Sequence, residues 1–184
     1  MVVPPHSAAA DEKATLRAAM RGRRLAFAPV PIAPPASFLA RLDRPGVIAA
    51  YLPMAGEADP ALLIDAALAR GWRLALPHVT TRAAPMRFLD GAAPRARGPF
   101  GLTQPIADAA ELAPDLILTP LLAFDAALNR LGQGAGYYDR AFAAHPDALR
   151  IGVAWSIQRA EAVPTDPWDA PLDAVITEKG WTER

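Results

Sequence analysis

Short, continuous apolar runs alternate along the chain with segments of helical periodicity. The runs lie at residues 46–52, 73–76, 86–89, 115–119, 150–155 and 174–177. Continuous apolar runs are typical of strands that are buried on both faces, as in parallel sheets covered by helices. The pattern therefore predicts an α/β fold, a single three-layer α/β/α domain with a mainly parallel sheet.

Helices are predicted between these runs from capping residues and charge placement. Residues 11–27 begin with acidic residues and end with arginines, which suits the helix dipole. Residues 61–70 follow Asp59-Pro60, an N-cap and a helix-starting proline, and end at Gly71. Residues 137–144 form a third helix. The proline-rich residues 28–37 are expected to be a stiff loop, because too little chain precedes them to fold alone.

Length and composition narrow the class of protein. The 184 residues suit one domain, 1–184, in which residues 1–10 are expected to be flexible. The chain has no cysteine, which excludes disulfides, cysteine-ligated zinc and thiol nucleophiles. Its 19 basic and 19 acidic residues cancel, which argues against nucleic acid as a partner. No apolar run is long enough to span a membrane, and the N-terminus does not look like a signal peptide. A cytoplasmic monomer is expected.

The segments that follow the predicted strands are where a ligand should bind. In open α/β sheets, ligands lie beyond the carboxyl ends of the strands. These segments are residues 53–60, 77–85, 120–139 and 156–169.

Residues 129–140, NRLGQGAGYYDR, have the composition of a phosphate-binding loop. Its three glycines permit positive φ and close approach of a ligand to the backbone, and the following helix N-terminus adds N–H donors. Arg130 and Arg140 flank them with permanent charge, and Asp139 offers a hard oxygen ligand for Mg²⁺. The spacing matches neither the P-loop nor the dinucleotide fingerprint. The alternative is a tight turn whose two tyrosines pack in the core.

A row of basic residues on the first helix is the second candidate element. At about 100° per residue, its members fall within an arc of roughly 80°. They are Lys13, Arg17, Arg21 and Arg24. Such a row is most often a solvated face. Beside the glycine loop, it could instead fold over a triphosphate.

These residues resemble a known family. RLGQGAGYYDR together with PLLAFD resembles the C-terminal motif of the 5-formyltetrahydrofolate cyclo-ligase family, and weaker matches lie in order along nearly the whole chain. The weaker matches are residues 13–17, 51–57, 86–88, 152–158 and 163–173. Departures from the family pattern leave the folate contacts less firmly implied than the nucleotide contacts; they fall at Gln104, Gln133, Ala135, Trp155, Asp166 and Trp168.

The resemblance implies ATP-dependent cyclisation of 5-formyltetrahydrofolate to 5,10-methenyltetrahydrofolate through phosphorylation of the formyl oxygen, with ADP and phosphate released. ATP and Mg²⁺ are the implied cofactors. The implied catalytic residues are Arg130, Tyr138 and Asp139. The implied ATP site comprises Lys13, Ala14, Thr15, Leu16 and Arg17, with Arg130, Leu131, Gly132, Gln133, Gly134, Ala135, Gly136, Tyr137 and Tyr138. The implied folate site comprises Leu52, Glu57, Gln133, Gly134, Ala135, Gly136 and Tyr137. Asp139 and Asp169 are the implied metal ligands, with Asp173 as the alternative to Asp169.

Two other functions stay open at this point. The chain could be a non-catalytic relative that binds nucleotide or folate, or an α/β enzyme whose glycine loop holds a different phosphate. Arg21 and Arg24 are candidates for the substrate's glutamate tail. Structural roles are expected for His78, Asp125 and Trp155.

Overall fold

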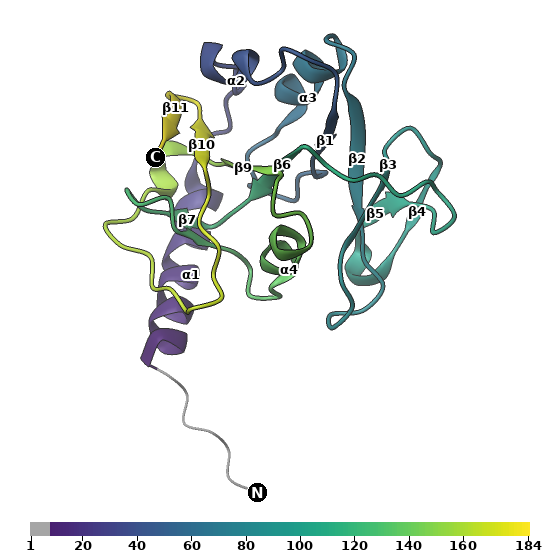
Figure 1. The fold of residues 1–184 in the computed structure, drawn as a ribbon. Coiled ribbons are helices and arrows are strands. Elements are labelled where there is room, and N and C mark those ends of the chain that lie inside the picture. Colours follow the sequence, from purple (N-terminus) through teal and green to yellow (C-terminus); the bar gives the residue numbers. More distant parts are fainter. Residues whose placement is uncertain (1–7) are drawn as a thin grey trace, which may run out of the picture.

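A seven-stranded sheet runs through the centre of the computed structural model, which describes residues 8–184 (Figure 1). Its order is β11-β10-β9-β6-β1-β2-β3. The inner neighbours from β10 to β2 pair in parallel, whereas β3 and β11 at the two edges are antiparallel. The prediction of a mainly parallel sheet is therefore confirmed. The strands are β1 (Val47–Ala49), β2 (Arg73–His78), β3 (Arg87–Asp90), β6 (Leu116–Pro120), β9 (Leu149–Val153), β10 (Ala174–Thr177) and β11 (Gly180–Glu183).

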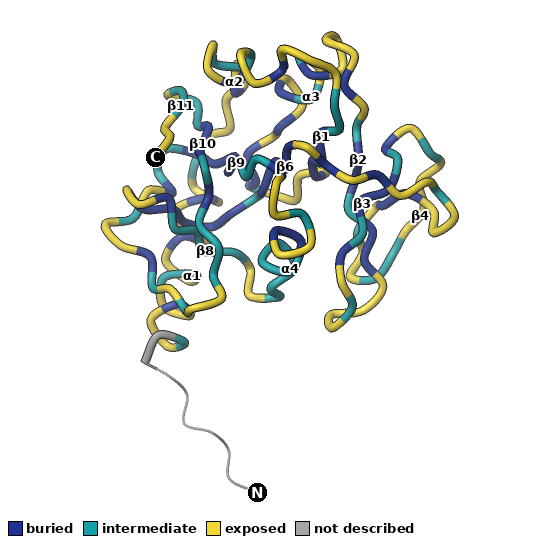
Figure 2. Tube along the Cα trace, in the orientation of Figure 1, coloured by how far each residue is buried: buried dark blue, intermediate teal, exposed yellow. Residues whose placement is uncertain are grey.

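Helices cover both faces of this sheet, as the continuous apolar runs predict. On one face, Leu116 and Leu118 pack in a cluster that includes residues of α2 (Ala36–Ala40) and α3 (Ala61–Leu68). On the other face, Ile117 packs in a cluster with α4 (Tyr137–Ala144). Figure 2 shows the same arrangement, with burial concentrated in the central strands. Successive side chains of β6 thus point to opposite faces of the sheet and pack against the helices on each face.

The helix α1 (Ala8–Ala26) lies apart from these two layers. It packs against β7 (Ala123–Phe124) and the 3₁₀ turn η2 (Ser156–Gln158), both of which follow carboxyl ends of the parallel strands. Met20 of α1 is buried there in a small cluster with Leu122 and Val163. The helix therefore covers the end of the sheet where a ligand is expected. Its side chains can reach that end from outside the sheet.

Several element boundaries differ from the prediction. The apolar run 46–52 forms a strand only over Val47–Ala49, although the Ala50 N–H still donates to the Ala75 carbonyl of β2. Residues 8–10, expected to be flexible, are helical, while residues 1–7 of that expectation lie outside the described residues. The proline-rich loop ends two residues early, where the unpredicted α2 begins. In the described part of the chain, no helix is long and apolar enough to cross a membrane.

A hairpin beside β2 and β3 was not predicted. It consists of β4 (Arg95–Arg97) and β5 (Thr103–Pro105), joined through a short turn η1 (Pro99–Gly101). The residues of β4 are all exposed, so no apolar alternation marks it in the sequence. A second unpredicted pairing joins β7 to β8 (Arg130–Leu131) and leads the chain into the glycine-rich segment.

Candidate active site

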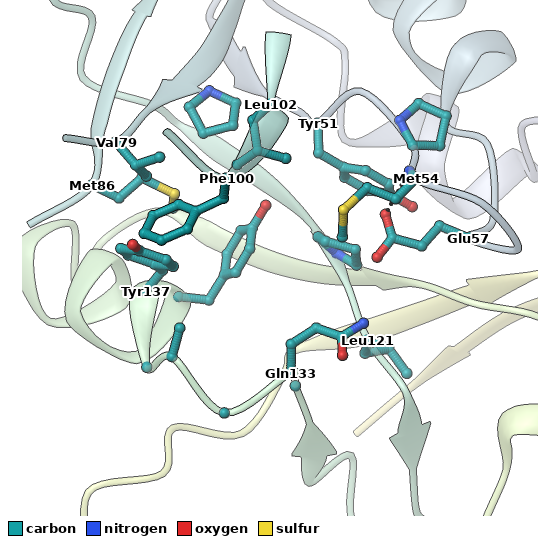
Figure 3. Close-up of a pocket in the computed structure, with 18 of the residues that line it drawn as sticks. Tyr51, Met54, Glu57, Val79, Met86, Phe100, Leu102, Leu121, Gln133 and Tyr137 are labelled. Atoms are coloured by element: carbon teal, nitrogen blue, oxygen red, sulfur yellow. Dashed lines mark hydrogen bonds between the residues drawn. The ribbon is translucent and has the colours of Figure 1, made fainter. Parts of the chain in front are cut away.

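A cavity of about 670 Å³ opens at the carboxyl ends of the parallel strands (Figure 3). All four segments predicted to follow strands contribute to its walls, which places the cavity where the sequence predicts a ligand site. Figure 3 shows two sides of it: Phe100, Met86 and Tyr137 lie on one, and Met54 and Glu57 on the other. The cavity is lined mainly by apolar and aromatic side chains, with the acid Glu57 in one wall and the glycine-rich hairpin along its edge.

The glycine-rich hairpin has the backbone geometry that its sequence suggests at two of its three glycines. Gly134 has φ +97° and Gly136 has φ +67°, and Gly136 is the N-cap of α4. Gly132 has no positive φ, so the prediction of positive φ is wrong there. Every residue from Arg130 to Asp139 lines the cavity. Both tyrosines are half-buried: they pack against the apolar cluster of α4, and they also line the cavity.

Two members of the basic row of α1, Arg17 and Arg21, contact this hairpin. Arg17 Nε donates to the Gly132 carbonyl at 3.0 Å, and Arg21 Nη2 donates to Gln133 Oε1 at 3.0 Å. Lys13 and Arg24, at the two ends of the row, are buried. The solvated-face alternative is therefore wrong for most of the row. The row spans about three turns of helix and brings a line of cations along the ligand-binding end of the sheet.

Lys13 is held between two carboxylates. Its Nζ lies 2.6 Å from Asp166 Oδ2 and also pairs with Asp169. Burial lowers the pKa of Lys13, but the hydrogen bonds and charges of the two aspartates outweigh it, so the pKa is raised overall. The Lys13 amine therefore stays protonated and positively charged. Asp169 also accepts the backbone N–H of Asp166, which fixes the loop that carries both acids.

Arg130 and Asp139 form a second ion pair at the base of the hairpin. Arg130 Nη2 lies 2.7 Å from Asp139 Oδ1, and the same guanidinium donates to the Ala170 carbonyl. Its Cζ lies 4.6 Å from the centre of the Phe142 ring. The Arg130 side chain is only 5 % exposed, whereas that of Asp139 is 27 % exposed. The arginine is thus fixed from three directions, and the carboxylate keeps an open side toward the cavity.

Glu57 is the buried acid of the opposite wall. Its Oε2 accepts the Met54 N–H at 3.0 Å, and its Oε1 lies 3.5 Å from Arg24 Nη1. Burial raises the pKa of Glu57, although the Met54 N–H and the Arg24 charge oppose this. The pairing also occupies Arg24, which is buried and not among the residues lining the cavity. Of the two arginines predicted for a glutamate tail, only Arg21 stays exposed.

One wall of the cavity has no counterpart among the residues predicted from the sequence. Phe100, at φ +61° and 67 % exposed, projects from the turn between β4 and β5. Gln104 holds this hairpin to β2, because its amide accepts the Val79 N–H and donates to the Val79 carbonyl, each at 3.1 Å. The Gly-Pro-Phe-Gly sequence at 98–101 is the signal that could have indicated a turn presenting an aromatic ring.

The other predicted residues separate into those at the cavity and those away from it. Asp169 lines the cavity, whereas Asp173 does not and accepts the Arg150 N–H. Leu52 lines the cavity. Ala14 and Thr15 are exposed on α1 and do not line it, and Leu16 packs on the apolar cluster around Met20.

The expected structural roles are confirmed: Trp155 is 1 % exposed, His78 contacts the Pro105 carbonyl, and Asp125 accepts N–H groups of Ala127, Asn129 and Val163.

A second, smaller cleft of about 580 Å³ adjoins the first on the far side of the hairpin. Six residues line both: Lys13, Arg17, Gly134, Gly136, Asp139 and Asp169. The shared boundary is thus made of two cations, two carboxylates and two glycines. Four of these six residues are charged, and the boundary joins an apolar basin to a charged cleft.

Comparison with known proteins matches this arrangement to one family. The model of the 5-formyltetrahydrofolate cyclo-ligase family matches residues 10–178. The chain belongs to that family. Among the cyclo-ligases, the protein named 5-formyltetrahydrofolate cyclo-ligase from Haemophilus influenzae is 33 % identical over 139 residues, covering 70 % of this chain and 74 % of that protein. Its counterpart from Escherichia coli K12 is 32 % identical over 139 residues, covering 71 % and 76 %.

Solved cyclo-ligase relatives share the fold. The structure of Aquifex aeolicus 5,10-methenyltetrahydrofolate synthetase has a TM-score of 0.70 at 28 % identity and covers 93 % of this chain and 92 % of that one. The Mycoplasma pneumoniae 5,10-methenyltetrahydrofolate synthetase, at 24 % identity and a TM-score of 0.69, covers 91 % and 99 % and supports the fold alone. The resemblance stated from the sequence motifs is therefore confirmed at the level of family and fold.

Proposed function

We propose that this chain converts 5-formyltetrahydrofolate to 5,10-methenyltetrahydrofolate at the expense of ATP, releasing ADP and phosphate. The family membership supports the reaction. The assignment of the reaction to this site rests on one observation: an apolar basin and a charged cleft meet at the glycine hairpin. A reaction between a ring-bearing folate and a polyphosphate needs such a junction, because the transferred phosphoryl group must touch both substrates.

The chemical difficulty is that the formyl oxygen is a poor leaving group. It attacks the γ-phosphorus of ATP, the bond from that phosphorus to the bridging oxygen breaks, and ADP departs. Nitrogen-10 of the folate then attacks the activated formyl carbon and loses its proton. The carbon–oxygen bond breaks, phosphate leaves, and the methenyl bridge remains. No protein nucleophile is required, so positioning and charge stabilisation are the tasks of the protein.

The residues at the junction supply those two functions. Arg130 is buried and fixed by Asp139 and Ala170, so its guanidinium is preorganised for charge that develops on a phosphoryl group. Arg17 lies over Gly134, and the N-terminus of α4 begins at Gly136. Burial raises the pKa of Tyr138, which keeps its hydroxyl a neutral donor. These groups support the assignment of the triphosphate to the hairpin.

The acids at the same place are suited to Mg²⁺ that arrives on ATP. The described residues contain no cluster of three or more potential ligands that would form a metal site by themselves. Mg²⁺ at phosphates commonly takes only one or two carboxylates, so Asp139 and Asp169 fit that requirement. They would hold the ion, which when bound neutralises phosphate charge. Asp139 keeps a partly exposed carboxylate for this role, and the Asp169 carboxylate lines the same boundary, where it pairs with Lys13.

The apolar basin is assigned to the folate. Leu52, Met54 and Phe100 offer apolar surface for its rings, and Glu57 offers a buried carboxyl to the N–H groups of the pterin. Gly134 and Gly136 line both cavities, and Gln133, Ala135 and Tyr137 line the basin beside them. All five are assigned to both ligands. We further assign the protein to the cytoplasm as a single-domain monomer without a nucleic-acid partner; sedimentation at several concentrations tests the monomer.

One mixing experiment tests the function. The protein is combined with Mg-ATP and 5-formyltetrahydrofolate, and the near-ultraviolet absorbance of the methenyl product is followed. Growth of that band only when both substrates are present is the expected result. Normal binding of both ligands with no product would favour the non-catalytic relative. Failure of ATP to bind in calorimetry would favour an enzyme of a different phosphate ester.

A further inference from the structure

The charged cleft extends beyond the part that it shares with the apolar basin. Five residues line only this extension: Ala10, Arg140, Ala143, Asp166 and Trp168. Three of them are apolar: the indole of Trp168 and two alanines from α1 and α4. The two charged residues are already paired, Arg140 with the Ala135 and Arg82 carbonyls and Asp166 with Lys13. The charged end of the cleft borders the hairpin, and the extension adds this apolar surface. The mechanism proposed above uses only the charged end.

Trp168 is unusual among the tryptophans of the chain. It is 72 % exposed, whereas Trp155 is 1 % and Trp72 is 7 % exposed. A large aromatic side chain left open to solvent forgoes the stabilisation of burial, and it offers a planar surface to a ligand. It immediately precedes Asp169, whose carboxylate is held by Lys13 and by the Asp166 N–H. The loop that presents the indole is thus tied down by ionic contacts on both sides.

We propose that Trp168 is the stacking platform for the purine base of the nucleotide, with Ala10 and Ala143 completing an apolar slot. This inference rests on the proposed function, because it takes the phosphates to lie at the shared charged boundary. A nucleotide held there by its phosphates can direct its base either into the folate basin or along the cleft toward Trp168. Only the second direction leaves the basin free for the folate.

The proposal also defines base specificity. The slot offers a base one aromatic face and two alanines, while the neighbouring Arg140 and Asp166 are paired within the protein. Stacking is tolerant of base identity because every base has a π face. Mg-GTP should therefore bind with an affinity similar to that of Mg-ATP. Mg-tripolyphosphate, which has no base, should bind more weakly and should not depend on Trp168.

The experiment measures binding without turnover. Titration calorimetry of Mg-ATP and Mg-tripolyphosphate is carried out on the wild type, Trp168→Ala and Trp168→Phe, together with tryptophan fluorescence. Trp168→Ala should weaken Mg-ATP by about 5- to 150-fold, the range measured for stacking of one base. It should leave Mg-tripolyphosphate unchanged. Trp168→Phe should retain most of the ATP affinity but lose the quenching that ATP causes in the wild type.

The control and the contrary outcomes separate this inference from the proposed function. Trp181→Phe changes a half-buried indole that lines neither cavity and should keep the quenching. Unchanged ATP affinity in Trp168→Ala overturns the inference, and so does an equal loss for ATP and tripolyphosphate, which would indicate support of the Asp169 loop instead. ATP that binds through Trp168 without any cyclisation would overturn the proposed function and leave the base site standing. A wild type that binds neither compound overturns both.

Discussion

Arg130 Nη2 and Asp139 Oδ1 lie 2.7 Å apart although the whole glycine hairpin separates them in sequence. The contact closes the hairpin at its base, so the charge on each residue helps to define the shape of the loop between them. It also keeps a cation and an anion at one point of the cavity wall. A phosphate and its magnesium ion would find a complementary group there for each charge.

Asp139→Asn removes the charge but keeps the shape and an acceptor for Arg130. We expect turnover to fall by about 100-fold or more, in the range found when one preorganised electrostatic group is lost. The melting temperature should change little, because the side chain is partly exposed and the hydrogen bond survives. Steady-state kinetics over a range of Mg²⁺ concentrations measure the effect. Asp108→Asn, on the surface, is the matched control; equal turnover in both variants would exclude Asp139 from the site.

Arg130→Lys tests the other member of the Arg130–Asp139 ion pair. The guanidinium contacts Ala170, Asp139 and the Phe142 ring at once, which a lysine ammonium cannot reproduce with its compact charge. We expect a raised KM for ATP together with lower turnover, and a smaller change in the KM for folate. An effect on the folate KM alone would mean that the hairpin holds the other substrate.

Glu57→Gln tests the buried acid of the folate basin. Affinity for 5-formyltetrahydrofolate should fall more than affinity for ATP, because Glu57 lies on the wall of the apolar basin and not on the boundary with the charged cleft. Equilibrium binding of each ligand measures the two effects separately. Glu161→Gln, an exposed acid, serves as the control. A folate affinity that stays at the wild-type value would remove Glu57 from the pocket.

The same variant carries a pH signature. Burial raises the pKa of Glu57 above its unfolded value, so the stability that this group contributes is present in full below the unfolded pKa and is lost as pH rises through the folded pKa. The variant does not titrate. The stability of the wild type minus that of Glu57→Gln should therefore decrease as the pH rises above the ordinary glutamate pKa of about 4.5, as measured by urea unfolding at each pH. A difference that grows with pH would contradict the assignment.

Gln104→Glu tests the clamp between the β4–β5 hairpin and β2. The buried amide both accepts from and donates to Val79, and a carboxylate has no proton to donate. We expect a loss of roughly 1–3 kcal/mol in stability at neutral pH. Part of it should return on acidification, because a protonated carboxyl regains a donor. Thermal unfolding at two pH values measures this, and a loss that is the same at both would argue against the donor role.

The features that are predicted best from the sequence are those that burial requires within a single strand or helix. The runs at 115–119 and 174–177 coincide with β6 and β10, because a strand covered on both faces must be apolar throughout. The hairpin β4–β5 was missed because Arg95–Arg97 is exposed, and because the hairpin is held by backbone pairing and by the contact of its Gln104 amide with Val79, 25 residues earlier. No local pattern marks such an element.

The residues of the site also divide into those that a local motif reveals and those that only the packing of distant elements brings together. The glycine hairpin is visible as a motif because its residues are contiguous and their backbone requirements are local. The pairing of Arg24 with Glu57, and of Lys13 with acids 153 and 156 residues away, depends on how α1 packs across the ends of the strands. A periodic row of cations is the same in sequence whether it meets water or carboxylates. Only the packing decides between them.

The glycines of the hairpin allow a final test, in which the same substitution at two nearby positions should change the stability of the protein to different extents. Gly134 has φ +97° and its Cβ position lies 3.4 Å from the Arg17 guanidinium, whereas Gly132 has no positive φ and nothing within 4 Å of its Cβ position. Gly134→Ala should cost about 1–2 kcal/mol because an L side chain is strained in that region, and Gly132→Ala should leave stability within about 0.5 kcal/mol of the wild type. Chemical denaturation of the two variants measures both values. Equal stability of the two would mean that the hairpin relaxes to another backbone conformation, and with it the preorganisation of this loop for phosphate would be lost.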